Sequence, residues 1–129
     1  MQSTNNPQPR PQELTRAELE IMQLFWANGP SMVNGLLDAM PDPKPAYNTV
    51  STVVRILEKK GFVGHKAYGK TYEYYPLVSK EAYASRYMDT VLDNFFGGSL
   101  SRLVSFFSEY KSITVEETDE ILLMLRERR

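Results

Sequence analysis

The hydrophobic pattern of this chain changes its period at Gly61, and this change limits the folds that the chain can form. Before Gly61 the apolar residues recur every three or four positions, which is the spacing of amphipathic helices. Residues 62–68 and 71–75 are instead rich in aromatic and β-branched side chains, and they flank Gly69-Lys70. That pattern is typical of a β-hairpin with a two-residue turn, and Pro76 ends its second strand. We therefore expect a helical segment followed by one short hairpin.

Caps and breakers divide the segment before Gly61 into three helices. Residues 15–18 form a capping box that starts the first helix, which a Gly-Pro pair ends. We expect the second helix over residues 33–40, because the proline-rich segment 41–45 allows no helix. The third is expected over residues 46–60, with Gly61 in the left-handed conformation that ends many helices. Its apolar stripe is Tyr47, Val50, Val53, Val54 and Leu57.

The charge of the chain is distributed unevenly, although its net value is only −1. Residues 41–72 carry six basic and two acidic groups, whereas residues 1–40 and 73–129 are both net acidic. A local excess of cations can contact a polyanion while the rest of the chain maintains solubility. The alternative is a basic surface that only faces solvent, and charge alone does not decide between the two.

The outward face of the third helix carries short hydrogen-bonding side chains rather than the Glu and Lys pairs of a purely solvated helix. Such side chains let the helix backbone approach a DNA major groove, where Asn, Thr and Arg can contact base edges. The predicted base-reading residues are Asn48, Thr49, Ser51, Thr52 and Arg55. The predicted phosphate contacts, before this helix and on the hairpin, are Lys44, Lys66, Tyr68 and Lys70. The alternative is an ordinary solvent face of a three-helix core.

From residue 79 onward the pattern is helical again. We expect one helix over residues 79–96, a second from Ser99 and a third from Thr114, with Gly97-Gly98 between the first two. The last helix is apolar over too much of its surface for an isolated helix, so part of it should meet a partner chain. The residues expected at this contact are Tyr87, Val91, Leu92, Phe95, Leu103, Phe107, Ile121, Leu122 and Leu125.

Together these elements predict a mainly α fold with a small β-wing, a winged helix-turn-helix followed by a C-terminal helical dimerisation arm. We expect a disordered polar tail over residues 1–12, a DNA-binding domain over 13–77 and a dimerisation domain over 78–129. This organisation favours a sequence-specific transcriptional repressor that binds double-stranded DNA as a homodimer. A winged helix that binds only proteins is the alternative, and the steep salt dependence of DNA affinity distinguishes the two.

Other classes of function find no support in the sequence. The chain has no cysteine, which excludes disulfide scaffolds, thiolate metal sites and cysteine nucleophiles. Its one histidine, His65, makes a poor metal site, and no nucleophile–base pair is apparent, so we expect no metal, no cofactor and no enzymatic activity. Residues 64–71 match the P-loop pattern, but they precede a strand rather than the helix that a P-loop needs. We expect no membrane insertion and no signal peptide, and hence a cytoplasmic protein.

Several short segments, spread from Leu14 to the C-terminus, are shared with a known family. They are residues 14–22 with Trp26, residues 47–50, residues 57–63, residues 72–74 and residues 96–100. Taken in this order they resemble the penicillinase-repressor (BlaI/MecI/CopY-like) family of winged-helix repressors. The resemblance implies a homodimer on a palindromic operator, with Asn48, Thr49 and Thr52 at matching positions of the recognition helix. It also implies that the C-terminal helices of two chains swap around each other.

The resemblance also implies a mode of induction. In antibiotic-responsive members, a membrane sensor with a metalloprotease domain triggers cleavage in the C-terminal arm, which weakens the dimer and releases DNA. The matching bond here is Ser99–Leu100, where this chain departs from the Asn-Phe of those members. A sensor metalloprotease is thus implied as an indirect partner, and an antibiotic-resistance operon as the target. Copper-responsive members use C-terminal cysteines, which this chain lacks.

Overall fold

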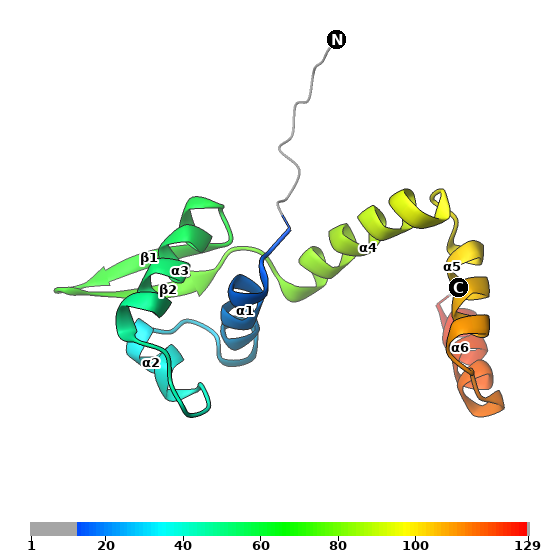
Figure 1. Ribbon diagram of the computed structural model, residues 1–129, viewed down its shortest axis with the longest axis horizontal. Helices are drawn as coiled ribbons and strands as arrows, with labels where there is room; N and C mark the ends of the chain where they lie inside the picture. Colours follow the sequence, from blue (N-terminus) through cyan, green and yellow to red (C-terminus); the bar gives the residue numbers. More distant parts are fainter. Residues whose placement is uncertain (1–12, 129) are drawn as a thin grey trace, which may run out of the picture. The chain divides into compact units, whose positions relative to one another are not determined.

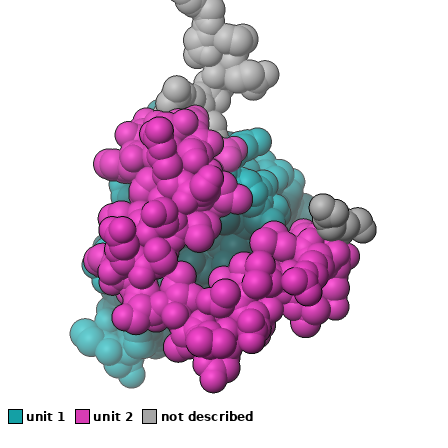
Figure 2. All heavy atoms as spheres, turned by 90° about the vertical axis from the view of Figure 1, so that its right-hand side faces the viewer, with its two compact units in different colours: residues 1–87 teal, residues 88–129 magenta. Residues whose placement is uncertain are grey.

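A computed structural model describes residues 13–128 of the chain, so the predicted tail over residues 1–12 lies outside the described residues. The elements in order are α1 (Arg16–Asn28), α2 (Val33–Asp38), α3 (Tyr47–Lys59), β1 (Val63–Tyr68), β2 (Thr71–Pro76), α4 (Lys80–Phe96), α5 (Leu100–Tyr110) and α6 (Val115–Glu127) (Figure 1). Three helices, a hairpin and further helices therefore follow one another as predicted. The chain divides into two compact units, residues 1–87 and 88–129, with the boundary inside α4 (Figure 2).

The first helix begins at the predicted capping box. The Thr15 hydroxyl accepts a hydrogen bond from the backbone N–H of Glu18 at 3.2 Å, and the Glu18 carboxylate accepts one from the Thr15 N–H at 2.9 Å. These two bonds satisfy backbone donors that the first turn of a helix leaves without partners. At the other end, Gly29 has a positive φ of 79° and donates its N–H to the carbonyl of Phe25. Both ends of α1 are therefore determined by residues next to them in sequence.

The third helix ends as expected but differs from the prediction at its start. Gly61 has a φ of 87°, and the Phe62 N–H bonds to the Leu57 carbonyl at 2.9 Å, which is the bond of a Schellman motif. Val50, Val54 and Leu57 are buried, whereas Tyr47 is 50% exposed. The prediction that Tyr47 belongs to the buried stripe was wrong. It occupies the first position of α3, and its side chain lines a surface cavity beside the hairpin instead of the core.

The two strands form an antiparallel hairpin with Gly69-Lys70 as its turn. Its register pairs Val63 with Pro76 at the base and Tyr68 with Thr71 at the tip. Ser31 adds a short bridge on the other edge of β2, where it exchanges two backbone hydrogen bonds of 2.8 and 2.9 Å with Tyr74. This bridge holds the segment between α1 and α2 against the hairpin, and no local pattern in the sequence predicts it.

One hydrophobic core lies among α1, α2, α3 and the base of the hairpin. Its buried members are Ile21, Met22, Phe25, Val33, Leu36, Val50, Val54, Leu57, Phe62, Val63 and Tyr74. The start of α4 is attached to this unit through Tyr83, whose hydroxyl accepts a hydrogen bond from the Leu14 N–H at 2.9 Å. Trp26 packs near the Tyr83 ring and donates its indole N–H to the Val78 carbonyl at 2.9 Å. The core and these attachments hold α3 and the hairpin in one rigid unit.

The second unit consists of helices with almost no buried side chains of their own. No residue of α4, α5 or α6 is fully buried in the described chain. The large apolar side chains that stay exposed include Phe95, Leu100, Val104, Phe106, Tyr110, Leu122, Leu123 and Leu125. An apolar surface of this extent is unusual for a protein that acts as a single chain, and it marks an interaction surface.

Candidate nucleic-acid interface

The outward face of α3 is small and polar, as the sequence predicts. Asn48, Thr49, Thr52 and Arg55 are exposed, and Ser51 is half-buried. The opposite face of the same helix is buried in the core, so the helix cannot turn these side chains away from solvent. The five predicted base-reading residues therefore lie on one helix and along one accessible face.

This face has two edges with different surroundings. Thr49 lies at the edge toward α1, where it lines a cavity with Val50 and Val53. Ser51 and Arg55 lie at the edge toward the hairpin, where they line a cavity of about 240 Å³ with Lys70 and Tyr72. A ligand that follows the face from Thr49 to Arg55 therefore meets the hairpin next to the Arg55 side.

Hydrogen bonds within α3 orient two of the polar side chains. The Thr52 hydroxyl donates to the Asn48 carbonyl at 2.8 Å, one turn earlier in the helix. The Arg55 guanidinium donates to the Thr52 oxygen at 3.4 Å. Because the Thr52 proton is already used, its remaining surface is an acceptor oxygen and a methyl group. A methyl group at this position suits contact with the methyl group of thymine.

The hairpin places its cations on two different surfaces. Lys66 and Tyr68 alternate with Ala67 on β1 and share the face of the hairpin directed away from α3, where the Lys66 ammonium lies 5.6 Å from the centre of the Tyr68 ring. Lys70 is in the turn and lines the cavity beside Arg55. Lys70 therefore lines one cavity together with Ser51 and Arg55 of the polar face of α3.

His65 connects the hairpin to α3, a contact that the sequence analysis did not predict. Its Nδ1 lies 2.6 Å from a Glu58 carboxylate oxygen, and its ring stacks on Tyr72 with 4.3 Å between the ring centres. Tyr74 is buried on the same face, and burial together with the nearby Glu58 carboxylate raises the pKa of Tyr74. Of the three tyrosines of β2, Tyr74 alone is buried, whereas Tyr72 is exposed and Tyr75 is half-buried. The side of the wing next to α3 is therefore held by an aromatic and polar cluster.

Lys44 caps the end of α2 in the structure, a contact that the sequence did not predict. Its ammonium donates hydrogen bonds to the carbonyls of Leu37 at 2.9 Å and of Met40, at the C-terminal end of α2. A cation at this position satisfies carbonyls that the end of a helix leaves without partners. In this arrangement Lys44 stabilises the end of α2.

A partly buried ion pair joins the start of α1 to the end of α3. The Lys60 ammonium donates to the Glu18 carboxylate at 2.7 Å, and Glu18 is only 5% exposed. Burial alone raises the pKa of the Glu18 carboxyl, but hydrogen bonds from Lys60 and from the Thr15 backbone outweigh it, and the pKa lies below its usual value. The partners are 42 positions apart, and no local pattern in the sequence predicts their contact.

The predicted cleavage position lies at the start of α5. Ser99 is the N-cap of that helix, with extended backbone and a side-chain oxygen that accepts from the Arg102 N–H at 3.2 Å. Leu100, on the other side of the bond, is 63% exposed. Gly97 and Gly98, just before it, both have positive φ. The bond therefore follows a short irregular connection between two helices.

The P-loop-like segment, residues 64–71, forms most of β1, the turn of the hairpin and the first residue of β2, with no helix after Thr71 until α4. Within residues 13–128, no three His, Asp or Glu side chains come together as a metal site. No helix in the same described range is long and apolar enough to cross a membrane.

A three-helix core, a third helix with an exposed polar face and a two-stranded hairpin beside it define the winged helix-turn-helix class of DNA-binding domain. Comparison with known proteins gives the particular family. The model of the penicillinase repressor family matches residues 14–127, and the chain belongs to this family. Its members are transcriptional repressors and not enzymes.

Individual relatives agree with this assignment. The penicillinase repressor of Bacillus licheniformis is 26% identical over 116 residues, which cover 89% of this chain and 91% of the relative. The methicillin resistance regulatory protein MecI of Staphylococcus aureus (strain N315) is 25% identical over 117 residues, covering 90% and 95%. The solution structure of the DNA binding domain of the repressor BlaI superposes with a TM-score of 0.50 at 26% identity, covering 60% of this chain and 94% of that chain. The predicted family and fold class are thereby confirmed.

Proposed function

We propose that this protein is a sequence-specific transcriptional repressor that binds a palindromic operator as a homodimer, with α3 in the major groove. The observation that supports this function best is the exposed polar face of α3, from Asn48 to Arg55, with the Lys70 turn beside it. The net charge of +4 over residues 41–72 favours the same polyanionic ligand. Each DNA-binding domain can bind its half of the operator weakly. Once one domain of a dimer is bound, the linkage raises the effective concentration of the second domain at its own half-site.

The proposed base-reading set is the one predicted from sequence, with roles that follow from position. Asn48 suits adenine, the Thr52 methyl suits thymine, and Arg55 suits guanine or a phosphate at the hairpin side. Thr49 and Ser51 contact base edges at the two borders of the face. Lys66, Tyr68 and Lys70 contact the phosphate backbone and carry no sequence information. Lys44 remains a proposed phosphate contact, and to make it the ammonium would leave the carbonyls that it caps in the single chain.

We assign dimerisation to the helical arm, over the predicted domain 78–129. Phe95 is 76% exposed in the single chain, and the predicted contacts on α6, Ile121, Leu122 and Leu125, are exposed as well. Burying such side chains against a second chain would contribute roughly 25 cal/mol per Å² of apolar surface removed from water. The remaining proposed contacts are Tyr87, Val91, Leu92, Leu103 and Phe107.

The names of the relatives suggest the regulated genes. A penicillinase repressor and a methicillin resistance regulator both point to a resistance-type operon, and we propose a target of that kind here. A membrane sensor metalloprotease is the proposed upstream partner, with Ser99–Leu100 as the bond to be cleaved. Cleavage there would separate α5 and α6 from α4 and so remove most of the proposed dimer surface.

Selection of bound sequences from a pool of random duplexes tests the main proposal. We expect an enriched palindrome whose half-sites are spaced by about one turn of DNA or a multiple of it, and an affinity that falls steeply with salt. A purified protein that ignores DNA at low ionic strength would support the alternative, a winged helix that binds only proteins. Enrichment without symmetry would contradict the homodimer.

A further inference from the structure

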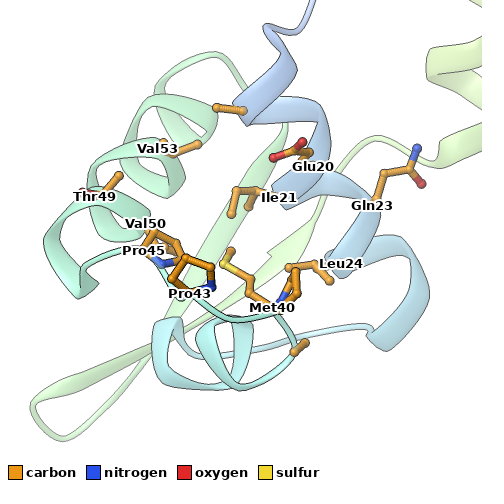
Figure 3. Close-up of a pocket in the computed structure, with 13 residues that line it drawn as sticks. Glu20, Ile21, Gln23, Leu24, Met40, Pro43, Pro45, Thr49, Val50 and Val53 are labelled. Atoms are coloured by element: carbon orange, nitrogen blue, oxygen red, sulfur yellow. The ribbon is translucent and has the colours of Figure 1, made fainter.

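We propose that the cavity between α1, the proline-rich segment 41–45 and α3 binds a small molecule with a compact apolar body and one amine. The cavity is about 540 Å³, within the range of about 300–1,000 Å³ typical of small-molecule sites. Its walls come from three separate elements, which Figure 3 shows surrounding one space. Among the described residues of its lining, Thr49 alone also belongs to the proposed contact of α3 with DNA.

The walls of the cavity are mainly apolar. Ile21 and Leu24 come from α1, Met40 and three prolines from the connection after α2, and Val50 and Val53 from α3. Proline walls move little, because their backbone φ is constrained by the ring. A site that is already formed and apolar favours a rigid hydrocarbon body, since few groups must be ordered on binding.

The polar groups at the rim determine which end group the ligand carries. Glu20 is the single charged side chain among the described residues that line the cavity, and Figure 3 shows it directed toward α3 while Gln23 points away. Its contact with Arg16, at 3.6 Å between two highly exposed side chains, is weak and leaves the carboxylate accessible. A carboxylate with no cation lining the cavity repels phosphate and attracts an ammonium group. The lining therefore disfavours a DNA backbone and favours an amine.

The position of the cavity couples it to α3. Thr49, Val50 and Val53 form one wall, and Pro45 lies two residues before the helix. The N-cap Ala46 provides no side-chain hydrogen bond, so the first turn of α3 is restrained mainly by these packing contacts. A ligand that changes the packing here acts on the helix turn that carries Asn48 and Thr49. This coupling, unlike the binding itself, rests on the proposed DNA function.

Binding is tested with 1-naphthylmethylamine on the full-length protein, by isothermal titration calorimetry and by amide chemical shifts. We expect a dissociation constant below about 1 mM, with shifts concentrated at residues 39–53. The neutral 1-naphthylmethanol should bind at least about fivefold more weakly, because it lacks the charge that pairs with Glu20. Absence of binding, or equal binding of the alcohol, would overturn the proposal. Amide shifts of residues 39–53 that change with protein concentration in the absence of ligand would show that a second copy of the chain occupies the cavity. That result would also overturn the proposal.

Two variants locate the site. Ala17 is exposed at the rim, so Ala17→Phe should fill the cavity and abolish amine binding. The control is Ala27→Phe on the same helix, which lies outside the cavity and should leave amine binding unchanged. Glu20→Gln should reduce amine affinity at least about fivefold and leave the alcohol unaffected, with Glu109→Gln as its control. Full binding by a folded Ala17→Phe variant, or by Glu20→Gln, would contradict the site.

Coupling is measured separately, by operator affinity with and without saturating amine. We expect a change of about 5-fold or more in wild type and none in Ala17→Phe, and by reciprocity operator DNA should change amine affinity by the same factor. Amine binding without this change would overturn the coupling and leave the site standing. If the wild-type protein does not bind operator DNA even in the absence of the amine, the proposed DNA function is refuted instead.

Discussion

At the scale of single residues, the side chains of the α3 face differ in their surroundings. Thr49 borders α1 and the proline-rich segment, Arg55 borders the hairpin, and Thr52 lies between them with its hydroxyl proton bonded to Asn48. Residues three positions apart on this face are therefore placed to meet different parts of a ligand. A base contact and a phosphate contact can be separated by single substitutions on this surface.

Thr49→Ala should relax sequence preference more than it weakens binding. Removal of a base contact costs roughly 1–3 kcal/mol on the operator and little on random DNA. Mobility shifts with operator and random duplexes at one salt concentration measure the difference, with Thr118→Ala in α6 as the control. Equal losses on both duplexes would remove Thr49 from the base-reading set.

Lys70→Ala should weaken DNA binding without changing sequence preference, the opposite of Thr49→Ala. A lost phosphate contact weakens all duplexes about equally and reduces the slope of log affinity against log salt by about one. A salt titration on operator and random DNA measures both effects, and Lys111→Ala, outside the winged unit, should change neither. A loss confined to the operator would mean that Lys70 reads bases.

At the scale of elements, the ion pair between Glu18 and Lys60 connects the start of α1 to the end of α3. The two side chains are 7% and 20% exposed, so water screens their attraction only in part. The pair helps to hold α3 in place from its C-terminal end, while Phe62 and the hairpin continue from the same point. The orientation of the recognition face thus depends on a contact far from it.

Lys60→Met should lower the free energy of unfolding by roughly 1–3 kcal/mol at neutral pH, since it leaves a buried carboxylate without its cation. The pKa of Glu18 is lower in the folded protein than in the unfolded chain, so the pair stabilises the fold above pH of about 4.5. That contribution disappears as the pH falls through the folded pKa, and the difference between variant and wild type should shrink there. Urea unfolding of both proteins, followed by circular dichroism at several pH values, measures this difference in the free energy of unfolding.

The matched control is Arg16→Met, which removes the exposed ion pair with Glu20 on the same helix. It should change stability too little to measure at any pH, because solvent screens that pair. An Lys60→Met penalty that stayed constant from pH 7 to pH 3 would show that packing of the Lys60 stem, and not the ion pair, is responsible.

At the scale of the whole molecule, the two units have different requirements for stability. The first unit has a closed core of eleven buried side chains, whereas α5 and α6 leave most of their apolar residues exposed. A helix with no buried residue of its own depends on a partner surface for its stability. Assembly and DNA affinity should therefore be linked, since in the proposed dimer the second unit contacts the partner chain and not DNA.

Leu122→Asp and Leu125→Asp should dissociate the dimer and reduce operator affinity by at least about tenfold, although neither residue contacts DNA in the proposed arrangement. Analytical ultracentrifugation measures the assembly state and mobility shifts measure the affinity. Ser101→Asp, an exposed polar position of α5, should leave both unchanged. Variants that stay dimeric and bind tightly would show that the arm has another role.

The comparison of sequence with structure separates local from non-local effects. The capping box at Thr15, the left-handed Gly61 and the Gly69-Lys70 turn were all predicted, because each acts through hydrogen bonds and backbone conformations within a few residues. The polar face of α3 was predicted as well, because helical periodicity determines which side chains share a face.

The tertiary structure alone decided which distant groups meet. The Ser31–Tyr74 bridge, the Glu18–Lys60 ion pair and the His65–Glu58 contact join residues whose separation in sequence gives no periodic signal. Packing also exposed Tyr47, directed Lys44 to the end of α2 and left a cavity beneath Thr49. By itself the sequence determined the elements and the polar face of α3 that is proposed to meet DNA, since these depend on neighbours along the chain. The positions of its cations and its cavity depend on how helices pack, and only the folded chain determines them.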